Sequence, residues 1–93
     1  MPTTAESLTT IRDAIEGLRV AARQDDDSRR ADAADWLDGL FDGVETRREL
    51  KSAIRESARL FHGGMGSFQD VGTEVMHQAV ERLGKALRSP WPW

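Results

Sequence analysis

The chain has 93 residues, of which 39% are apolar and 31% are charged, and it carries a net charge of −3. These values predict one globular domain, and they exclude a disordered chain and a globally basic nucleic-acid-binding protein. No cysteine is present, which excludes disulfides, thiolate metal sites and cysteine nucleophiles. No apolar run approaches the ~20 residues of a membrane span, and no secretory signal is evident, so we expect a cytoplasmic protein with no membrane partner.

The first predicted helix covers residues 4–23. Thr3 and Glu6 have the spacing of a capping box, in which each side chain accepts a hydrogen bond from the backbone of the other. Gly17 weakens the helix by about 1 kcal/mol relative to alanine and would let a neighbouring helix approach closely. The apolar positions follow one stripe at helical spacing: Leu8, Ile11, Ile15, Leu18 and Ala22.

The second predicted helix covers residues 28–42. Its apolar positions recur at the spacing of one helix face, which predicts that they are buried together. Gly43 is a plausible stop, since glycine readily adopts the left-handed conformation found after helix ends. The apolar set is Ala33, Trp36, Leu37, Leu40 and Phe41.

Two more helices are predicted, over residues 46–61 and 67–88. Thr46 and Glu49 form a second capping-box pattern, and Ser67 can cap the last helix with Asp70 three residues later. Prolines end helical structure in the tail 89–93. Because strand patterns are nearly absent, the sequence predicts an all-α fold, a small single-domain bundle of about four helices.

The segment "HGGMGSFQD" between the last two helices admits two interpretations. Glycines before a helix N-terminus favour an anion, so the segment could be a ligand-binding loop. It lacks the preceding strand, the lysine and the spacing of a phosphate-binding loop, which favours a structural corner between two helices. The residues concerned, as corner or as anion site, are Gly63, Gly64, Gly66, Ser67 and Asp70.

This segment also carries a family resemblance. "GGMGSFQD" resembles the "GGMGSFND" signature of a family of small uncharacterised bacterial proteins, with Gln69 in place of the more usual asparagine. The earlier "DWLDGLFDG" is similar, more loosely, to a tryptophan-containing helix of that family. The resemblance implies a helical frame and no known activity. By analogy, small proteins of this kind are often immunity or antitoxin proteins encoded beside bacterial toxins.

Acidic residues are concentrated between positions 25 and 45, where eight acids accompany two arginines. Asp35, Asp38 and Asp42 share one face of the second helix, and Asp32 belongs to the same stripe. Such a stripe is either a solvated face or a binding site for a basic protein partner. The acidic triplet at 25–27 has none of the spacing of a calcium-binding EF-hand loop.

A basic stripe follows on the third helix: Arg48, Lys51, Arg55 and Arg59. We expect it to pair with the acids of the second helix. Nucleic-acid binding is not expected, since no aromatic residues interleave. The two histidines are too few for a metal site, and no nucleophile with its base is assembled. The sequence therefore predicts no enzyme activity and no cofactor.

The tail "SPWPW" places Trp91 and Trp93 within its last three residues. They either cover the end of the core or act as anchors in a homodimer or partner interface. The leading functional hypothesis is a non-catalytic immunity or antitoxin protein that occludes a toxin. The alternative is a regulatory module that binds an anion or nucleotide at the glycine-rich corner.

Overall fold

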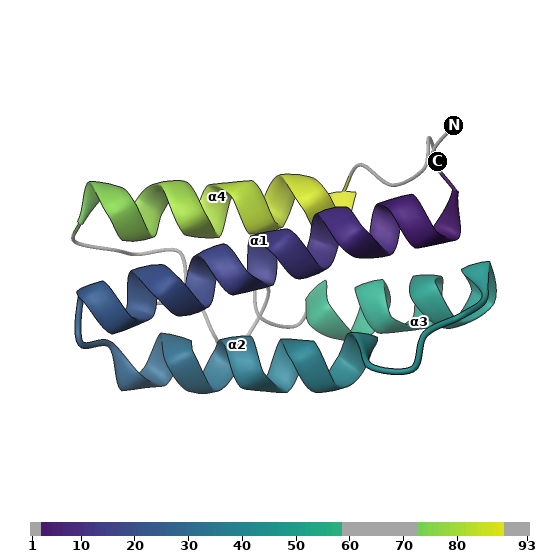
Figure 1. The fold of residues 1–93 in the computed structure, drawn as a ribbon, viewed down its shortest axis with the longest axis horizontal. Helices are drawn as coiled ribbons and strands as arrows, with labels where there is room; N and C mark the ends of the chain where they lie inside the picture. Colours follow the sequence, from purple (N-terminus) through teal and green to yellow (C-terminus); the bar gives the residue numbers. More distant parts are fainter. Residues whose placement is uncertain (1–2, 59–72, 89–93) are drawn as a thin grey trace.

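Four α-helices make up the part of the chain that this computed structural model describes, residues 3–58 and 73–88 (Figure 1). They are α1 (Thr4–Gln24), α2 (Ser28–Phe41), α3 (Arg47–Ser57) and α4 (Glu74–Arg88). No strand occurs within these described ranges. The predicted all-α bundle is therefore confirmed.

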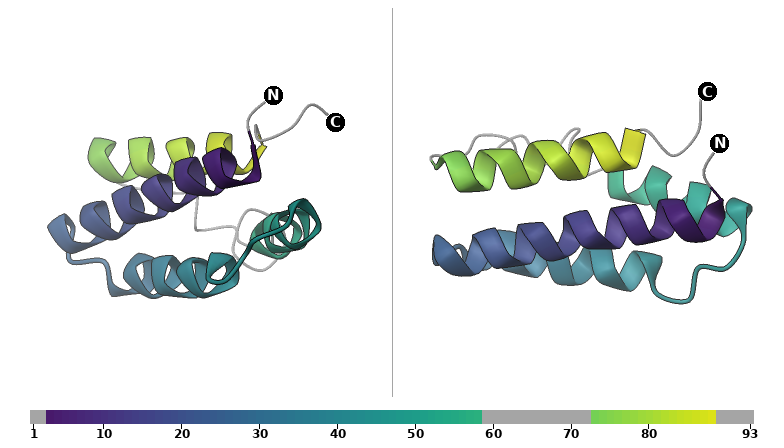
Figure 2. Two further views of the ribbon diagram at one scale, coloured as in Figure 1. Left: turned by 45° about the vertical axis from the view of Figure 1, so that its right-hand side comes forward. Right: turned by 45° about the horizontal axis from the view of Figure 1, so that its top comes forward.

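The first helix is the centre of the arrangement. α1 packs along its length between α2 and α4, whereas α3 lies at the end of the molecule where α1 begins (Figures 1 and 2). Because α1 has partners on both sides, its buried stripe is broad. It comprises Ser7, Ile11, Ala14, Ile15, Leu18, Ala21 and Ala22.

The hydrophobic core joins all four helices. Its largest fully buried side chain is Phe41, in the last turn of α2. α3 contributes Leu50 and Ala53, and α4 contributes a stripe at helical spacing: Met76, Val80, Leu83, Ala86 and Leu87. Spacings of three and four residues place these buried positions on one face of each helix.

The helix starts follow the predicted local signals, with one difference. Both capping boxes, Thr3 with Glu6 and Thr46 with Glu49, are present with reciprocal hydrogen bonds. α4 begins later than expected: the Thr73 hydroxyl oxygen accepts a hydrogen bond from the Met76 amide at 3.2 Å, as an N-cap does. The predicted cap Ser67 lies outside the described residues.

The acidic triplet at 25–27 forms the connection from α1 to α2, and each aspartate has a structural role. Asp26 has a φ of 53°, the left-handed conformation that usually favours glycine. The Asp26 and Asp27 amides donate to carbonyls of the last turn of α1, which completes a Schellman end. Asp27 then caps α2. Asp25 accepts a hydrogen bond from the Thr73 hydroxyl at 2.5 Å, which links the end of α1 to the start of α4.

The predictions for three further residues have different outcomes. Gly43, with a φ of 78°, directly follows the α2 C-cap Asp42, as expected of a helix stop. Trp36 is 42% exposed, so its predicted place in the buried stripe of α2 is wrong. The pattern misled because Trp36 borders the stripe rather than lying in its middle. At Gly17 no backbone of the described residues comes close, since the described atom nearest to an added Cβ is an Arg82 side-chain nitrogen at 3.9 Å.

The caps make the fold sensitive to acid. Backbone hydrogen bonds from Glu45 and Thr46 lower the pKa of Glu49 below its ordinary value of 4.5. Hydrogen bonds from Arg30 likewise lower the pKa of Asp27 below 3.8. Because the folded pKa values are lowered, this stabilisation is complete above the unfolded values and is lost as pH falls through the folded ones.

We therefore expect the free energy of unfolding to be nearly constant from pH 7 to about 5 and to fall below about pH 4. Glu49→Gln is the matched variant, because glutamine can keep the capping hydrogen bond without titrating. Urea titrations at pH 7, 4 and 3 should show a smaller acid loss in Glu49→Gln than in the wild type. An equal loss in both proteins would contradict this role of Glu49.

Candidate functional site

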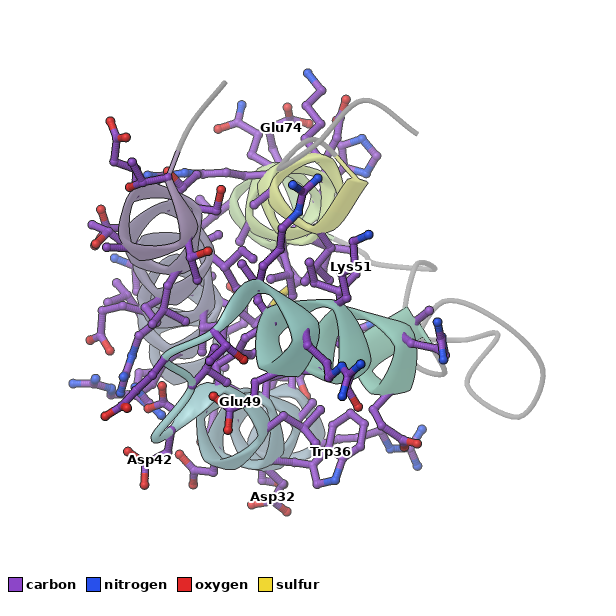
Figure 3. The ribbon with its side chains drawn as sticks, turned by 90° about the vertical axis from the view of Figure 1, so that its right-hand side faces the viewer. Asp32, Trp36, Asp42, Glu49, Lys51 and Glu74 are labelled. Carbon is purple, nitrogen blue, oxygen red and sulfur yellow. The ribbon has the colours of Figure 1, made fainter. Side chains whose placement is uncertain are left out.

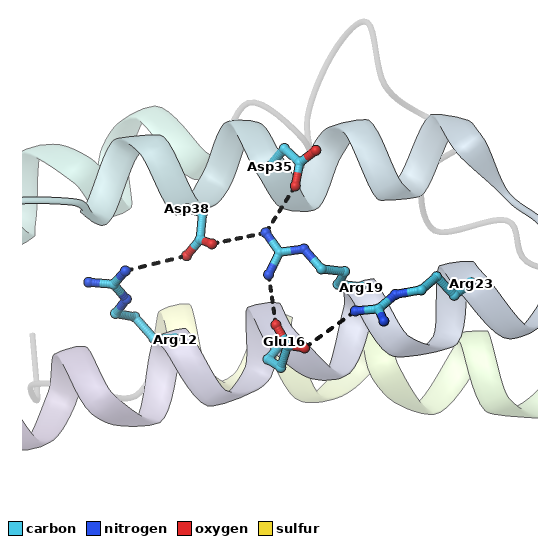
Figure 4. Close-up of polar contacts among 6 residues, drawn as sticks. All are labelled: Arg12, Glu16, Arg19, Arg23, Asp35 and Asp38. Atoms are coloured by element: carbon cyan, nitrogen blue, oxygen red, sulfur yellow. Dashed lines mark hydrogen bonds and ion pairs between the residues drawn. The ribbon is translucent and has the colours of Figure 1, made fainter.

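The acidic stripe of α2 is divided between an internal and an outward part. Internally, one guanidinium of α1 holds two of its carboxylates (Figure 4). Arg19 donates to Asp35 at 3.0 Å, to Asp38 at 2.9 Å and to Glu16 of its own helix at 2.7 Å. Arg12 adds a longer ion pair with Asp38, at 3.7 Å.

This network changes the role of the predicted acids. Hydrogen bonds to Asp38, then to Asp35 and Glu16, raise the pKa of Arg19 well above its ordinary value. The Asp38 side chain is only 34% exposed and is shared by two arginines. Asp38 is therefore mainly a link between α1 and α2. Asp35 keeps an outward, exposed position beside the same link.

The outward part of α2 is a surface of four residues that we call the α2 face: Asp32, Trp36, Gly39 and Asp42. All four are exposed. Figure 3 shows Asp32 and Asp42 directed away from the other helices, with Trp36 on the flank of α2 near α3. In residues 3–58 and 73–88, neither Asp32 nor Asp42 has an ion-pair partner.

Gly39 opens this face. It lies inside α2, where glycine costs about 1 kcal/mol relative to alanine. An added Cβ would meet nothing within 4 Å among the described atoms, so packing against the described residues does not require a glycine here. Trp36 and Gly39 are three residues apart and thus neighbours on the helix surface. The missing side chain leaves the flank of the indole accessible.

The charge at the end of α2 is unfavourable for the isolated helix. The last turn of α2 contains no basic residue, and Asp42 is its C-cap. The helix dipole places partial negative charge at this end, where a carboxylate is destabilising and a cation is favoured. The α2 face thus combines an exposed tryptophan with negative charge that a cationic partner would neutralise.

The described part of the basic stripe of α3 does not pair with the acids of α2 as predicted. The described partners of Asp35 and Asp38 are arginines of α1, not of α3. In the described ranges no acidic side chain pairs with Arg48 or Arg55. These two residues lie on the exposed side of α3, opposite buried Leu50. Arg59 lies outside the described residues.

Several other predicted residues cannot be placed. The glycine-rich corner (Gly63, Gly64, Gly66, Ser67 and Asp70) and the tail tryptophans Trp91 and Trp93 lie outside the described residues. Their proposed roles as corner, anion site or interface anchors stay predictions. In the described part of the chain, no three His, Asp or Glu side chains are grouped so that they could hold a metal ion.

The sequence pattern missed the parts of the site that depend on neighbours. Gly39 was not predicted as a site residue, although a glycine inside a helix near a tryptophan can indicate an accessible binding surface. Arg12 and Arg19 were not predicted as site residues because they lie on α1 while their aspartates lie on α2. No local sequence pattern joins residues of two different helices. The one usable signal is their seven-residue spacing, which places both arginines on one face of α1.

Fold and site together define the class: a small all-α bundle with a charged, tryptophan-bearing helix face. Comparison of the chain with protein-family models, with curated proteins and with solved structures finds no match. Among the described helices, none is both long and apolar enough to cross a membrane.

Proposed function

We propose that this protein is a non-catalytic protein-binding module, an immunity or antitoxin protein that binds a toxin through the α2 face and occludes it. The observation that carries the proposal is Trp36, a tryptophan 42% exposed between two acids without described partners. Tryptophan is one of the residue types enriched among the anchors of protein interfaces. A cytoplasmic site of action agrees with the absence of cysteine.

Charge specifies the kind of partner. Asp32 and Asp42 lie about 15 Å apart along α2, at roughly 1.5 Å per residue, with Trp36 between them. A fitting partner surface has an apolar pocket for the indole and flanking lysine or arginine side chains. Many toxins act on nucleic acids or nucleotides and need such basic surfaces, so binding there would block their substrates.

The test is co-expression with the products of the neighbouring reading frames. We expect one of them to be toxic alone, to be tolerated with this protein, and to form a complex that survives gel filtration at physiological salt. Trp36→Ala should weaken that complex about 30-fold or more, the cost of losing an interface anchor of about 2 kcal/mol. Binding constants from titration calorimetry and growth of the host cells are the two measurements.

Two matched variants make the test specific. Val75→Ala removes a side chain that is 50% exposed on α4, and it should leave binding unchanged. Gly39→Ala should stabilise the helix by up to about 1 kcal/mol and yet weaken binding, because its methyl group narrows the surface beside Trp36. The proposal fails if no neighbouring product is toxic, if no complex forms, or if Trp36→Ala binds as the wild type does.

A further inference from the structure

A second charged surface, on α3, has no role in the proposed function. Its side chains border a hollow of about 500 Å³. The hollow is open to solvent, and all of its described lining residues belong to α3. Among the described residues, four cationic side chains and one hydroxyl line it, and no acid does: Arg47, Arg48, Lys51, Ser52 and Arg55.

The helix presents these residues for a simple geometric reason. Leu50, Ala53 and Ser57 occupy the buried side of α3, so the positions opposite them face solvent. Figure 3 shows Lys51 on the side of α3 nearer α4, while Glu49 lies on the side nearer α2. Glu49 is therefore directed away from the hollow and is already held by its capping hydrogen bonds.

The site is one of side chains, not of a helix end. The N-terminus of α3 is closed by the capping box of Thr46 and Glu49, whose carboxylate would repel an anion there. Arg48 and Arg55, in contrast, are spaced about 10 Å apart along the axis, at roughly 1.5 Å per residue. Neither has an acidic partner within residues 3–58 and 73–88. Two guanidinium groups are thus available on either side of the Ser52 hydroxyl.

We propose that this hollow binds a compact anion with two or more phosphate groups. Arginine presents a planar fork that matches phosphate oxygens with paired hydrogen bonds, and such charge-assisted bonds are about twice as strong as neutral ones. Because Arg48 and Arg55 are about 10 Å apart along the helix, they can contact two linked phosphate groups better than one isolated phosphate. No aromatic side chain is among the described lining residues, so nothing there offers the stacking that single-stranded nucleic acids use.

The experiment is titration calorimetry of the full chain with sodium tripolyphosphate, orthophosphate and a 15-nucleotide oligothymidylate at fixed ionic strength. We expect tripolyphosphate to bind at least tenfold more tightly than orthophosphate. The double variant Arg48→Ala/Arg55→Ala should lose at least tenfold of that affinity. Both changes lie on the exposed side of α3, and circular dichroism will verify that the variant is folded.

A second double variant with the same change in net charge controls for the general electrostatic attraction of anions to the protein. Arg82→Ala/Lys85→Ala removes two exposed cations from α4 and should bind tripolyphosphate nearly as the wild type does. Equal losses in the two double variants would overturn the proposal, as would equal binding of tripolyphosphate and orthophosphate. Binding of the oligonucleotide without tripolyphosphate binding would also overturn it and assign α3 to a nucleic-acid backbone. Since α3 is not part of the α2 face, this test stands apart from the toxin experiment.

Discussion

Phe41→Ala is expected to lower the free energy of unfolding by about 3–5 kcal/mol, the largest effect of any single substitution considered. Phe41 is the largest of the fully buried side chains and is 0% exposed. Truncating it removes the transfer free energy of the ring and leaves a cavity that the neighbouring helices fill only in part. A domain of this size has only about 5–15 kcal/mol of stability in total, so the loss is a large fraction of it.

The measurement is urea unfolding followed by circular dichroism, with thermal melting as a second readout. At about 4–8 °C per kcal/mol for a small domain, the melting temperature should fall by more than about 10 °C. Phe41→Leu is the control, because it removes fewer atoms and leaves a smaller cavity, so it should cost clearly less than Phe41→Ala. A loss below about 1 kcal/mol in Phe41→Ala would show that Phe41 is not a centre of the core.

Arg19→Met is expected to lower the free energy of unfolding by about 1–2 kcal/mol at low salt. Methionine retains an apolar stem of similar length, so the change removes mainly the charge and the hydrogen bonds. Single exposed ion pairs contribute up to about 1 kcal/mol. Arg19 is only 23% exposed and joins three carboxylates, two of them on α2. Loss of the Arg19 guanidinium leaves the carboxylates of Asp35 and Asp38 close together without the cation that they share.

Arg23→Met is the matched control for this prediction. The Arg23 side chain is 67% exposed and forms one distant pair with Glu16, at 3.6 Å, so we expect almost no change in stability. Urea titrations should be repeated in about 1 M NaCl, where the Debye length falls to ~3 Å. If the Arg19→Met loss is as large in high salt as in low salt, the network contributes through packing and the electrostatic explanation is wrong.

The features that could be predicted from the sequence are those that depend on close neighbours in the chain. The capping boxes at Thr3 and Thr46 require residues only three positions apart. The helix stop at Gly43 depends only on the ability of glycine to adopt a positive φ. Helical periodicity likewise identified Leu18 and Leu37 as core residues before any partner was known. Such local signals fixed the fold class.

The features that escaped prediction depend on which helices become neighbours. Trp36 has the spacing of a buried residue, yet it lies at the border of the α2 stripe and stays 42% exposed. Asp35 and Asp38 form an acidic pattern that is equally compatible with a solvated face, a partner or an internal network. Only the packing of α1 against α2 brings Arg19 to them. The end of α1 likewise uses Asp26 where a glycine would be expected.

The central position of α1 has a consequence for the order of folding. α1 and α2 are joined by three aspartates, so their contacts are local and close only a small loop. α4 reaches α1 from much farther along the chain, as the hydrogen bond between Thr73 and Asp25 illustrates. Contacts of low sequence separation form fastest, since they lose the least chain entropy. We therefore expect the α1–α2 hairpin to form before α4 docks on α1, so in pulse-labelling amide exchange the α1–α2 amides should gain protection before those of α4.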